Sequence, residues 1–253
     1  AAQATALGLD PVLVRRVEVG DRGGPEAAAR DARHAAFRDA LAGTGATRVL
    51  LGHTLDDQAE TVLLGLARGA GPDSLSGMRL DTPPLLRPLL GLRRATTVAA
   101  CADQGLEAWD DPMNADDRFL RVRLRAAALP ALEAALGPGV AEALARTADQ
   151  VQEDAAALDA IADELAPDLA ELAEQGIALP VPALAANPAA LRHRLIRLAV
   201  LDEFGVVLTR AQTLAVARLV TDWHGQGVLA LPGVTVERIG RRIEFRAASQ
   251  GRA

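Results

Sequence analysis

Residues 48–69 read RVLLGHTLDDQAETVLLGLARG, and the order of patterns within them indicates an α/β fold. The apolar run at 48–52 has the length of a buried parallel strand. Helical spacing of apolar residues then continues from about Leu55 to Arg68, and Gly69 is expected to end this helix. The stretch therefore predicts a strand that leads directly into a helix.

Polar side chains gather where this predicted strand meets the helix. Ligands of open α/β sheets bind at the carboxyl ends of strands, and Thr54 is expected to cap the helix. An imidazole and three carboxylates at this place would suit Mg²⁺ on a nucleotide or a cationic substrate. Acidic residues in a first helical turn also complement the helix dipole without any further function, so the spacing alone leaves both interpretations open. The four candidates are His53, Asp56, Asp57 and Glu60.

The preceding segment extends the alternation of strand and helix. Residues 12–19 are rich in Val and predict an earlier strand. Pro25 is expected to open an Ala-rich helix that Gly43 and Gly45 end. Strand, helix, strand and helix in this order imply right-handed crossovers and a parallel sheet that is covered on both faces. The predicted fold class of the first part is therefore α/β.

After Pro138 the sequence becomes mostly helical. Apolar residues recur every seven positions and predict a seam on a long acidic helix, which Pro167 is expected to interrupt or kink. A second amphipathic helix, with Arg on its polar face, is predicted at 191–205, and a small antiparallel β-unit at 227–247. The residues of the seam are Leu144, Val151, Leu158, Leu165 and Leu172.

Composition and charge narrow the classes of function. The 253 residues contain no Lys, which excludes Schiff-base chemistry and a Walker A lysine, and only 2% aromatics, which disfavours a base-stacking platform. The single Cys101 excludes disulfides, and no apolar run reaches about 18 residues, so we expect a cytoplasmic protein with no membrane partner. Residues 140–190 hold one Arg and ten acids, whereas residues 191–253 hold ten Arg and five acids. The basic segment suits either phosphate binding or a solvated helix face.

Four segments, in order and spacing, resemble the tRNA(Ile)-lysidine synthetase family of PP-loop ATP-pyrophosphatases. They are HTLDDQAET at 53–61, LARGAGPDSLSGM at 66–78, LLRPLL at 85–90 and DDPMNADDRFLRVRLR at 110–125. Upstream, EAAARDARHAAF at 26–37 resembles the Arg-bearing helix of the family. The resemblance covers about residues 1–245. It implies an incomplete PP-loop domain at 1–138, with its first strands missing, and at 139–253 a mostly helical tRNA-binding domain with a small terminal β-unit.

The resemblance also implies a reaction. ATP, with Mg²⁺, would adenylate C2 of the wobble cytidine in a tRNA(Ile) with a CAU anticodon, and free lysine would then displace AMP to give lysidine. A pocket of carboxylates suits capture of the lysine ammonium group. A homodimer is a further expectation.

Roles carry over position by position onto this sequence. The implied catalytic residues are Asp57, Glu60, Arg121 and Arg123. The implied ATP-binding residues are Arg30, Arg33, His53, Asp56 and Asp57, of which Asp56 and Asp57 would also hold the metal. The residues expected to contact tRNA phosphates are Arg192, Arg194 and Arg197.

The sequence departs from the family in two places. The smaller departure is DRFLRVRLR at 117–125, which offers Arg but no Asn and leaves open which Arg is catalytic. The SGGxDS pyrophosphate loop is expected to lie before residue 1, and GAGPDS at 69–74 is no substitute because it follows a helix. The chain as given is therefore expected to bind ATP poorly and not to turn over. Two alternatives stay open: a related PP-loop tRNA thiolase, which the single Cys101 disfavours, and a noncatalytic RNA-binding remnant.

Overall fold

The strand and helix expected at 48–69 are both present in the computed structural model, which describes residues 1–20, 24–69, 71–109 and 111–248. Strand β1 (Val49–Leu50) precedes helix α3 (Leu55–Arg68), which ends at Gly69 with φ 61°. That left-handed conformation is readily available to glycine, so the predicted helix end is confirmed. The predicted burial of the strand is wrong for Leu50, whose exposed fraction is 66%.

The strand belongs to a small mixed sheet. Its order is β1-β3-β2, with β2 at Asp81–Thr82 and β3 at Leu85–Leu86. β1 pairs with β3 in parallel, whereas β2 and β3 are antiparallel. The strand predicted at 12–19 is wrong, because within the described residues this segment pairs with no other strand. Its β-branched residues favour an extended backbone, but a strand also needs a hydrogen-bonding neighbour.

The chain divides into two compact units, residues 1–151 and 152–253. Helix α2 of the first unit begins at Pro25 and is capped by Gly45, as predicted, whereas Gly43, also expected at the helix end, lies within the helix. The helices of this unit, with the 3₁₀ turn η1 and the π-helical turn η2, are α1 (Ala2–Ala6), α2 (Pro25–Thr44), α3, α4 (Pro72–Leu75), α5 (Arg94–Asp103), η1 (Pro112–Ala115), α6 (Leu120–Arg123), η2 (Leu124–Ala128) and α7 (Leu129–Leu136).

Helix α3 is held firmly by its neighbours. Leu55 and Ala59 of α3 form a buried cluster with Leu129 of α7 and Ala141 of α8 (Val140–Leu169). On another side, a Cβ at Gly65 would collide with the carbonyl of Ser74, so α3 and α4 approach closely only because position 65 is glycine. This packing fixes the helix that carries the candidate carboxylates.

The long acidic helix is present as α8, and residues 140–151 of it belong to the first unit. Pro167 lies inside α8, two residues before its end, so the predicted interruption does not occur at this position. Pro167 has no backbone N–H to continue the helical hydrogen bonds, and the helix ends at Leu169. The buried residues of α8 do recur every seven positions, but they are alanines, namely Ala141, Ala148, Ala155 and Ala162. Leu172 lies beyond the helix and is 92% exposed, so the predicted seam ends before it.

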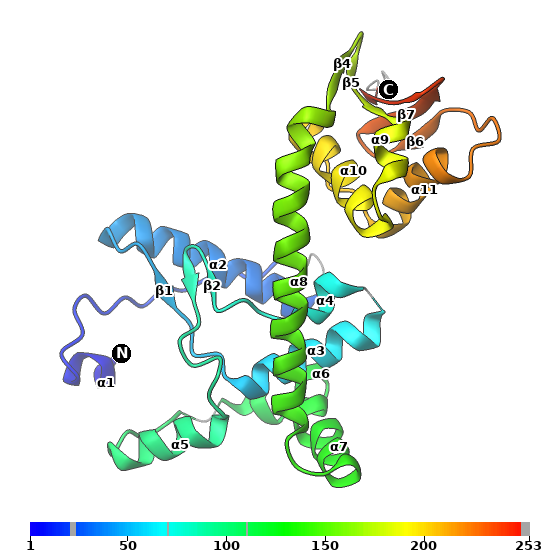
Figure 1. Cartoon of the computed structure of the whole chain (residues 1–253). Coiled ribbons are helices and arrows are strands. Elements are labelled where there is room, and N and C mark those ends of the chain that lie inside the picture. Colours follow the sequence, from blue (N-terminus) through cyan, green and yellow to red (C-terminus); the bar gives the residue numbers. More distant parts are fainter. Residues whose placement is uncertain (21–23, 70, 110, 249–253) are drawn as a thin grey trace. The chain divides into compact units, whose positions relative to one another are not determined.

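The second unit is an antiparallel sheet packed against helices (Figure 1). The strand order is β4-β5-β8-β7-β6, and Phe245 and Ile243 of β8 are fully buried in the core. The β-unit predicted at 227–247 is confirmed by β6–β8, whereas β4 and β5 were not expected. The elements are β4 (Glu171–Ala173), β5 (Gly176–Pro180), α9 (Val181–Ala186), α10 (Ala189–Phe204), α11 (Arg210–Thr221), β6 (Leu229–Leu231), β7 (Val234–Ile239) and β8 (Arg242–Ala247).

Within the described residues, no helix combines the length and the apolar character that crossing a membrane requires.

Candidate active site

Asp57 is fixed at the start of α3. Thr54 is the N-cap residue of α3, as expected. Its backbone N–H and its hydroxyl both donate to Asp57 Oδ2 at 2.8 Å. On the other oxygen, Arg94 Nη2 lies 2.7 Å from Oδ1. Burial acts to raise the pKa of Asp57, but the Thr54 hydrogen bonds and the charges of Arg94 and Arg125 outweigh it and lower the pKa. Asp57 is therefore a carboxylate at neutral pH.

Glu60 is completely buried and paired with an arginine. Its exposed fraction is 0%, and Arg125 Nε donates to Oε1 at 2.7 Å while Nη2 lies 3.3 Å from Oε2. Arg121 Nη1 is 4.0 Å from Oε2 and 3.4 Å from the hydroxyl of Thr61. A buried carboxylate needs such a partner, because an unpaired charge in the interior is very costly.

Asp56 points toward the start of α5. Its Oδ2 accepts the backbone N–H of Arg94 at 2.7 Å, and its Oδ1 lies 3.3 Å from Arg93 Nη1. Arg93 also lies 3.4 Å from Glu142 on α8. Two arginines at a helix N-terminus oppose the helix dipole, and nearby carboxylates offset this cost.

The three carboxylates are thus balanced by arginines rather than forming an acidic pocket. Arg93, Arg94 and Arg125 each lie within 3.4 Å of one of them, and Arg121 lies at the edge of the group. The prediction from sequence missed Arg93, Arg94 and Arg125. Two signals were available: the RR pair at the start of a helix, and the spacing of four between Arg121 and Arg125 on one helical face.

The carboxylates do not fit a magnesium site in this arrangement. The described residues contain no group of three or more His, Cys, Asp or Glu side chains placed to hold a metal ion. Both oxygens of Asp57 and both oxygens of Asp56 already accept hydrogen bonds or face guanidinium groups. We therefore derive no step through a metal at these residues.

His53 has a different environment, in which positive charges dominate. Its Nδ1 is buried and has no hydrogen-bond partner among the described residues. Burial lowers the pKa of His53, and the charges of Arg87, Arg33 and Arg121 lower it further against the opposing effect of Asp57. The imidazole is therefore neutral at pH 7, with one unused polar atom beside cationic groups.

Arg30 belongs to the same group of positive charges as Arg33 and Arg87, since its charge together with burial lowers the pKa of Arg87. Such a set of residues fits the phosphates of a nucleotide.

Arg123 is not brought to the carboxylates. Its Nη1 donates to the carbonyls of Asp117 and Arg118 at 2.7 and 3.1 Å, so it orders the preceding loop. Arg118 is exposed and pairs with Asp116. Of the arginines in this stretch, Arg121 and Arg125 lie at the candidate site.

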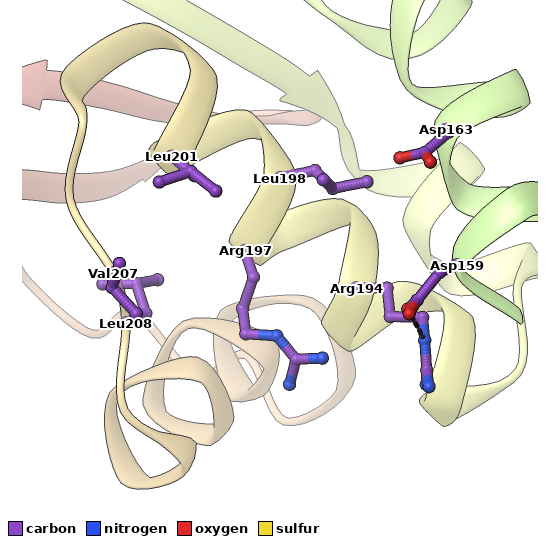
Figure 2. A pocket seen from close by; sticks show the side chains of 8 residues that line it. All are labelled: Asp159, Asp163, Arg194, Arg197, Leu198, Leu201, Val207 and Leu208. Carbon is purple, nitrogen blue, oxygen red and sulfur yellow. Dashed lines mark hydrogen bonds and ion pairs between the residues drawn. The ribbon is translucent and has the colours of Figure 1, made fainter. Parts of the chain in front are cut away.

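The three arginines expected to contact tRNA phosphates differ in whether their guanidinium groups are already bonded within the protein. Arg192 Nη1 lies 3.3 Å from the carbonyls of Leu184 and Asn187, and Arg194 Nε pairs with Asp159 at 2.7 Å. Among the described residues, the side chain of Arg197 has no hydrogen bond or ion pair, although its backbone belongs to α10. Arg194, Asp159 and Arg197 all line a pocket of about 370 Å³. Figure 2 shows these side chains, with the Arg194–Asp159 pair to one side of Arg197.

Comparison with known proteins matches both units. Residues 4–132 match the family model of the PP-loop domain, and residues 179–243 match that of the TilS substrate binding domain. The tRNA(Ile)-lysidine synthase of Leifsonia xyli is 65% identical over 246 residues, which are 97% of this chain and 74% of that protein. The chain belongs to the tRNA(Ile)-lysidine synthase family.

Other members agree with this assignment. The tRNA(Ile)-lysidine synthases of Nocardia farcinica and Streptomyces coelicolor are 54% and 50% identical to the chain. The matches cover 93% and 95% of this chain, and 72% and 69% of those proteins. The family membership expected from the four sequence segments is confirmed.

The lowered pKa of Asp57 predicts a pH dependence of stability. A carboxylate with a depressed pKa stabilises the fold above its ordinary pKa of 3.8, and this contribution is lost as the pH falls toward the native pKa. We expect the melting temperature of the unaltered protein to exceed that of Asp57→Asn at pH 6, and this difference to shrink by about 2–4 °C as the pH falls below 3.8. Thermal denaturation across pH 3–6 measures it, and a difference that stays constant or widens toward acid would contradict the assignment.

Proposed function

We propose that this chain belongs to an enzyme that catalyses ATP-dependent formation of lysidine on tRNA(Ile), with its chemistry at the start of α3 and with tRNA bound by the second unit. The observation that carries the proposal is the ordered set of ion pairs around Asp57 and Glu60 in a chain whose relatives are tRNA(Ile)-lysidine synthases. An adenylating ligase needs fixed cations where phosphate charge develops, and Arg121 and Arg125 lie beside the carboxylates in this way.

Arg30, Arg33 and His53 would hold the nucleotide. The arginines supply positive charge to its phosphates, and the free Nδ1 of the neutral His53 supplies one further polar contact. The cytidine oxygen is by itself a poor leaving group. When bound, ATP supplies the AMP group that makes this oxygen a good leaving group. Holding that group in place is the task of these residues.

Free lysine is the second substrate in the proposal, and Asp57 is the carboxylate that would meet its ammonium group. A carboxylate oxygen can accept a second hydrogen bond, so Oδ1 can take the ammonium beside Arg94, whereas a metal ion would have to displace the guanidinium. The side chain of Asp57 retains 15% exposure, whereas Glu60 has none. Glu60 therefore acts through Arg125, whose guanidinium it orients with two contacts. A cytoplasmic location and a homodimer belong to the same proposal.

Product analysis tests the proposed function. The full-length gene product would be incubated with ATP, lysine and a tRNA(Ile) transcript with a CAU anticodon, and the digested nucleosides examined by mass spectrometry. We expect lysidine, and none when the wobble cytidine is replaced by uridine. In a parallel incubation with sulfide in place of lysine, a sulfur-containing nucleoside would favour a thiolase, and tRNA binding without any modification in either incubation would favour a noncatalytic remnant.

The tRNA contact is predicted to rest on Arg197 rather than on Arg194. Replacing Arg197 with Gln should reduce the slope of log affinity against log salt by roughly 0.7–0.9, because one phosphate contact is lost. Arg194→Gln should leave the slope nearly unchanged, since Asp159 already holds that guanidinium. Filter binding of tRNA from 50 to 300 mM salt measures both slopes, and equal slopes for the unaltered protein and Arg197→Gln would contradict this contact.

A further inference from the structure

The start of α5 lacks a cap of its own. Its N-cap residue is Arg93, whose side chain accepts no hydrogen bond, and the first turn contains no acidic residue. The first N–H groups of a helix have no partner within the helix, so an outside acceptor must satisfy them. Asp56, 38 positions earlier in the sequence, accepts the N–H of Arg94 at 2.7 Å.

This contact determines where the Arg94 side chain can reach. The same residue that gives its backbone N–H to Asp56 places its guanidinium 2.7 Å from Asp57 Oδ1. Thr54 holds the other oxygen of Asp57. Asp57 is thus fixed on one side by its own helix and on the other by a helix that Asp56 holds in position.

Arg93 strengthens the same attachment. It lies between Asp56 at 3.3 Å and Glu142 at 3.4 Å, so it connects α3 to the first turns of α8. One oxygen of Asp56 therefore accepts a backbone N–H, and the other faces a guanidinium. A metal cation at Asp56 would have to compete with these two contacts.

We propose that Asp56 is a positioning residue that caps α5 and so holds Arg94 against Asp57, instead of a magnesium ligand. The inference deepens the proposed function, because it concerns the residues that arrange Asp57 for the reaction. It differs from the metal role expected from the sequence resemblance. An Asn at position 56 can still accept the Arg94 N–H, whereas an Ala cannot.

Hydrogen exchange of the full-length gene product tests the capping role. In Asp56→Ala, peptides covering residues 92–98 should exchange about fivefold faster than in the unaltered protein. In Asp56→Asn they should keep most of their protection. Asp39→Asn, which removes the same charge from the exposed side of α2, is the matched control and should leave this exchange unchanged. Unchanged exchange in Asp56→Ala would overturn the inference.

The magnesium dependence of lysidine formation provides a second readout. We expect the rate lost in Asp56→Ala to be largely recovered in Asp56→Asn, with the half-saturating Mg²⁺ concentration within about twofold of the unaltered protein. A tenfold rise of that concentration in Asp56→Asn would show that Asp56 is a metal ligand and overturn the inference. Hydrogen exchange requires no turnover, so a lack of lysidine formation by the unaltered protein would count against the proposed function alone.

Discussion

Replacing Glu60 with alanine is expected to lower the free energy of unfolding of the first unit by about 3–5 kcal/mol. Glu60 is fully buried, and its two contacts with Arg125 are 2.7 and 3.3 Å long. Removing one partner of a buried ion pair leaves the other charge without compensation, which costs more than the pair itself contributes. Denaturation by urea, followed by circular dichroism, measures the change.

A double variant separates the cost of a stranded charge from a general loss of packing. Glu60→Leu combined with Arg125→Met replaces the pair by apolar groups of similar volume, and should recover most of the stability lost in Glu60→Ala. Asp39→Ala, at an exposed position of α2, should change the free energy of unfolding by less than about 0.5 kcal/mol. A loss below 1 kcal/mol in Glu60→Ala would mean that Glu60 does not hold Arg125 in solution.

Replacing Asp57 with alanine is expected to slow lysidine formation by about 100-fold or more, with little change in tRNA affinity. The substitution removes the carboxylate proposed to meet lysine and releases the guanidinium of Arg94. Single-turnover formation of lysidine, with tRNA binding measured in parallel, checks the prediction.

The two readouts also separate an enzyme from a remnant. An enzyme loses turnover in Asp57→Ala while it keeps its tRNA affinity. A rate within threefold of the unaltered protein would show that Asp57 lies outside the chemistry. The exposed Asp39→Ala should match the unaltered protein in both measurements.

Local signals made α3 predictable from the sequence. Thr54 and Gly69 are good capping residues for short-range reasons, and the bounds Leu55–Arg68 follow from them. The region at 12–19 was not predictable in this way, because β-branched residues show only a preference for extended backbone and cannot show whether a neighbouring strand exists. The position of Pro167 was not predictable either, because the sequence does not show that α8 continues to Leu169 before it ends.

The carboxylates of the candidate site were found from sequence, but their partners were not. Asp57 and Glu60 stand in one motif, whereas Arg94 and Arg125 come from segments 37 and 65 positions away. Only tertiary structure brings those charges together. The expected acidic pocket is for that reason a balanced network, in which arginines hold each carboxylate in a defined position.

The stoichiometry of the reaction tests the central claim most directly. Full-length gene product, tRNA(Ile) with a CAU anticodon, radiolabelled ATP and lysine would be mixed, and pyrophosphate, AMP and lysidine counted over one turnover. We predict one pyrophosphate and one AMP for each lysidine, with AMP and lysidine abolished or greatly slowed in Asp57→Ala. Lysidine formed without pyrophosphate release, or formed at an unchanged rate in Asp57→Ala, would contradict a ligase site built on α3.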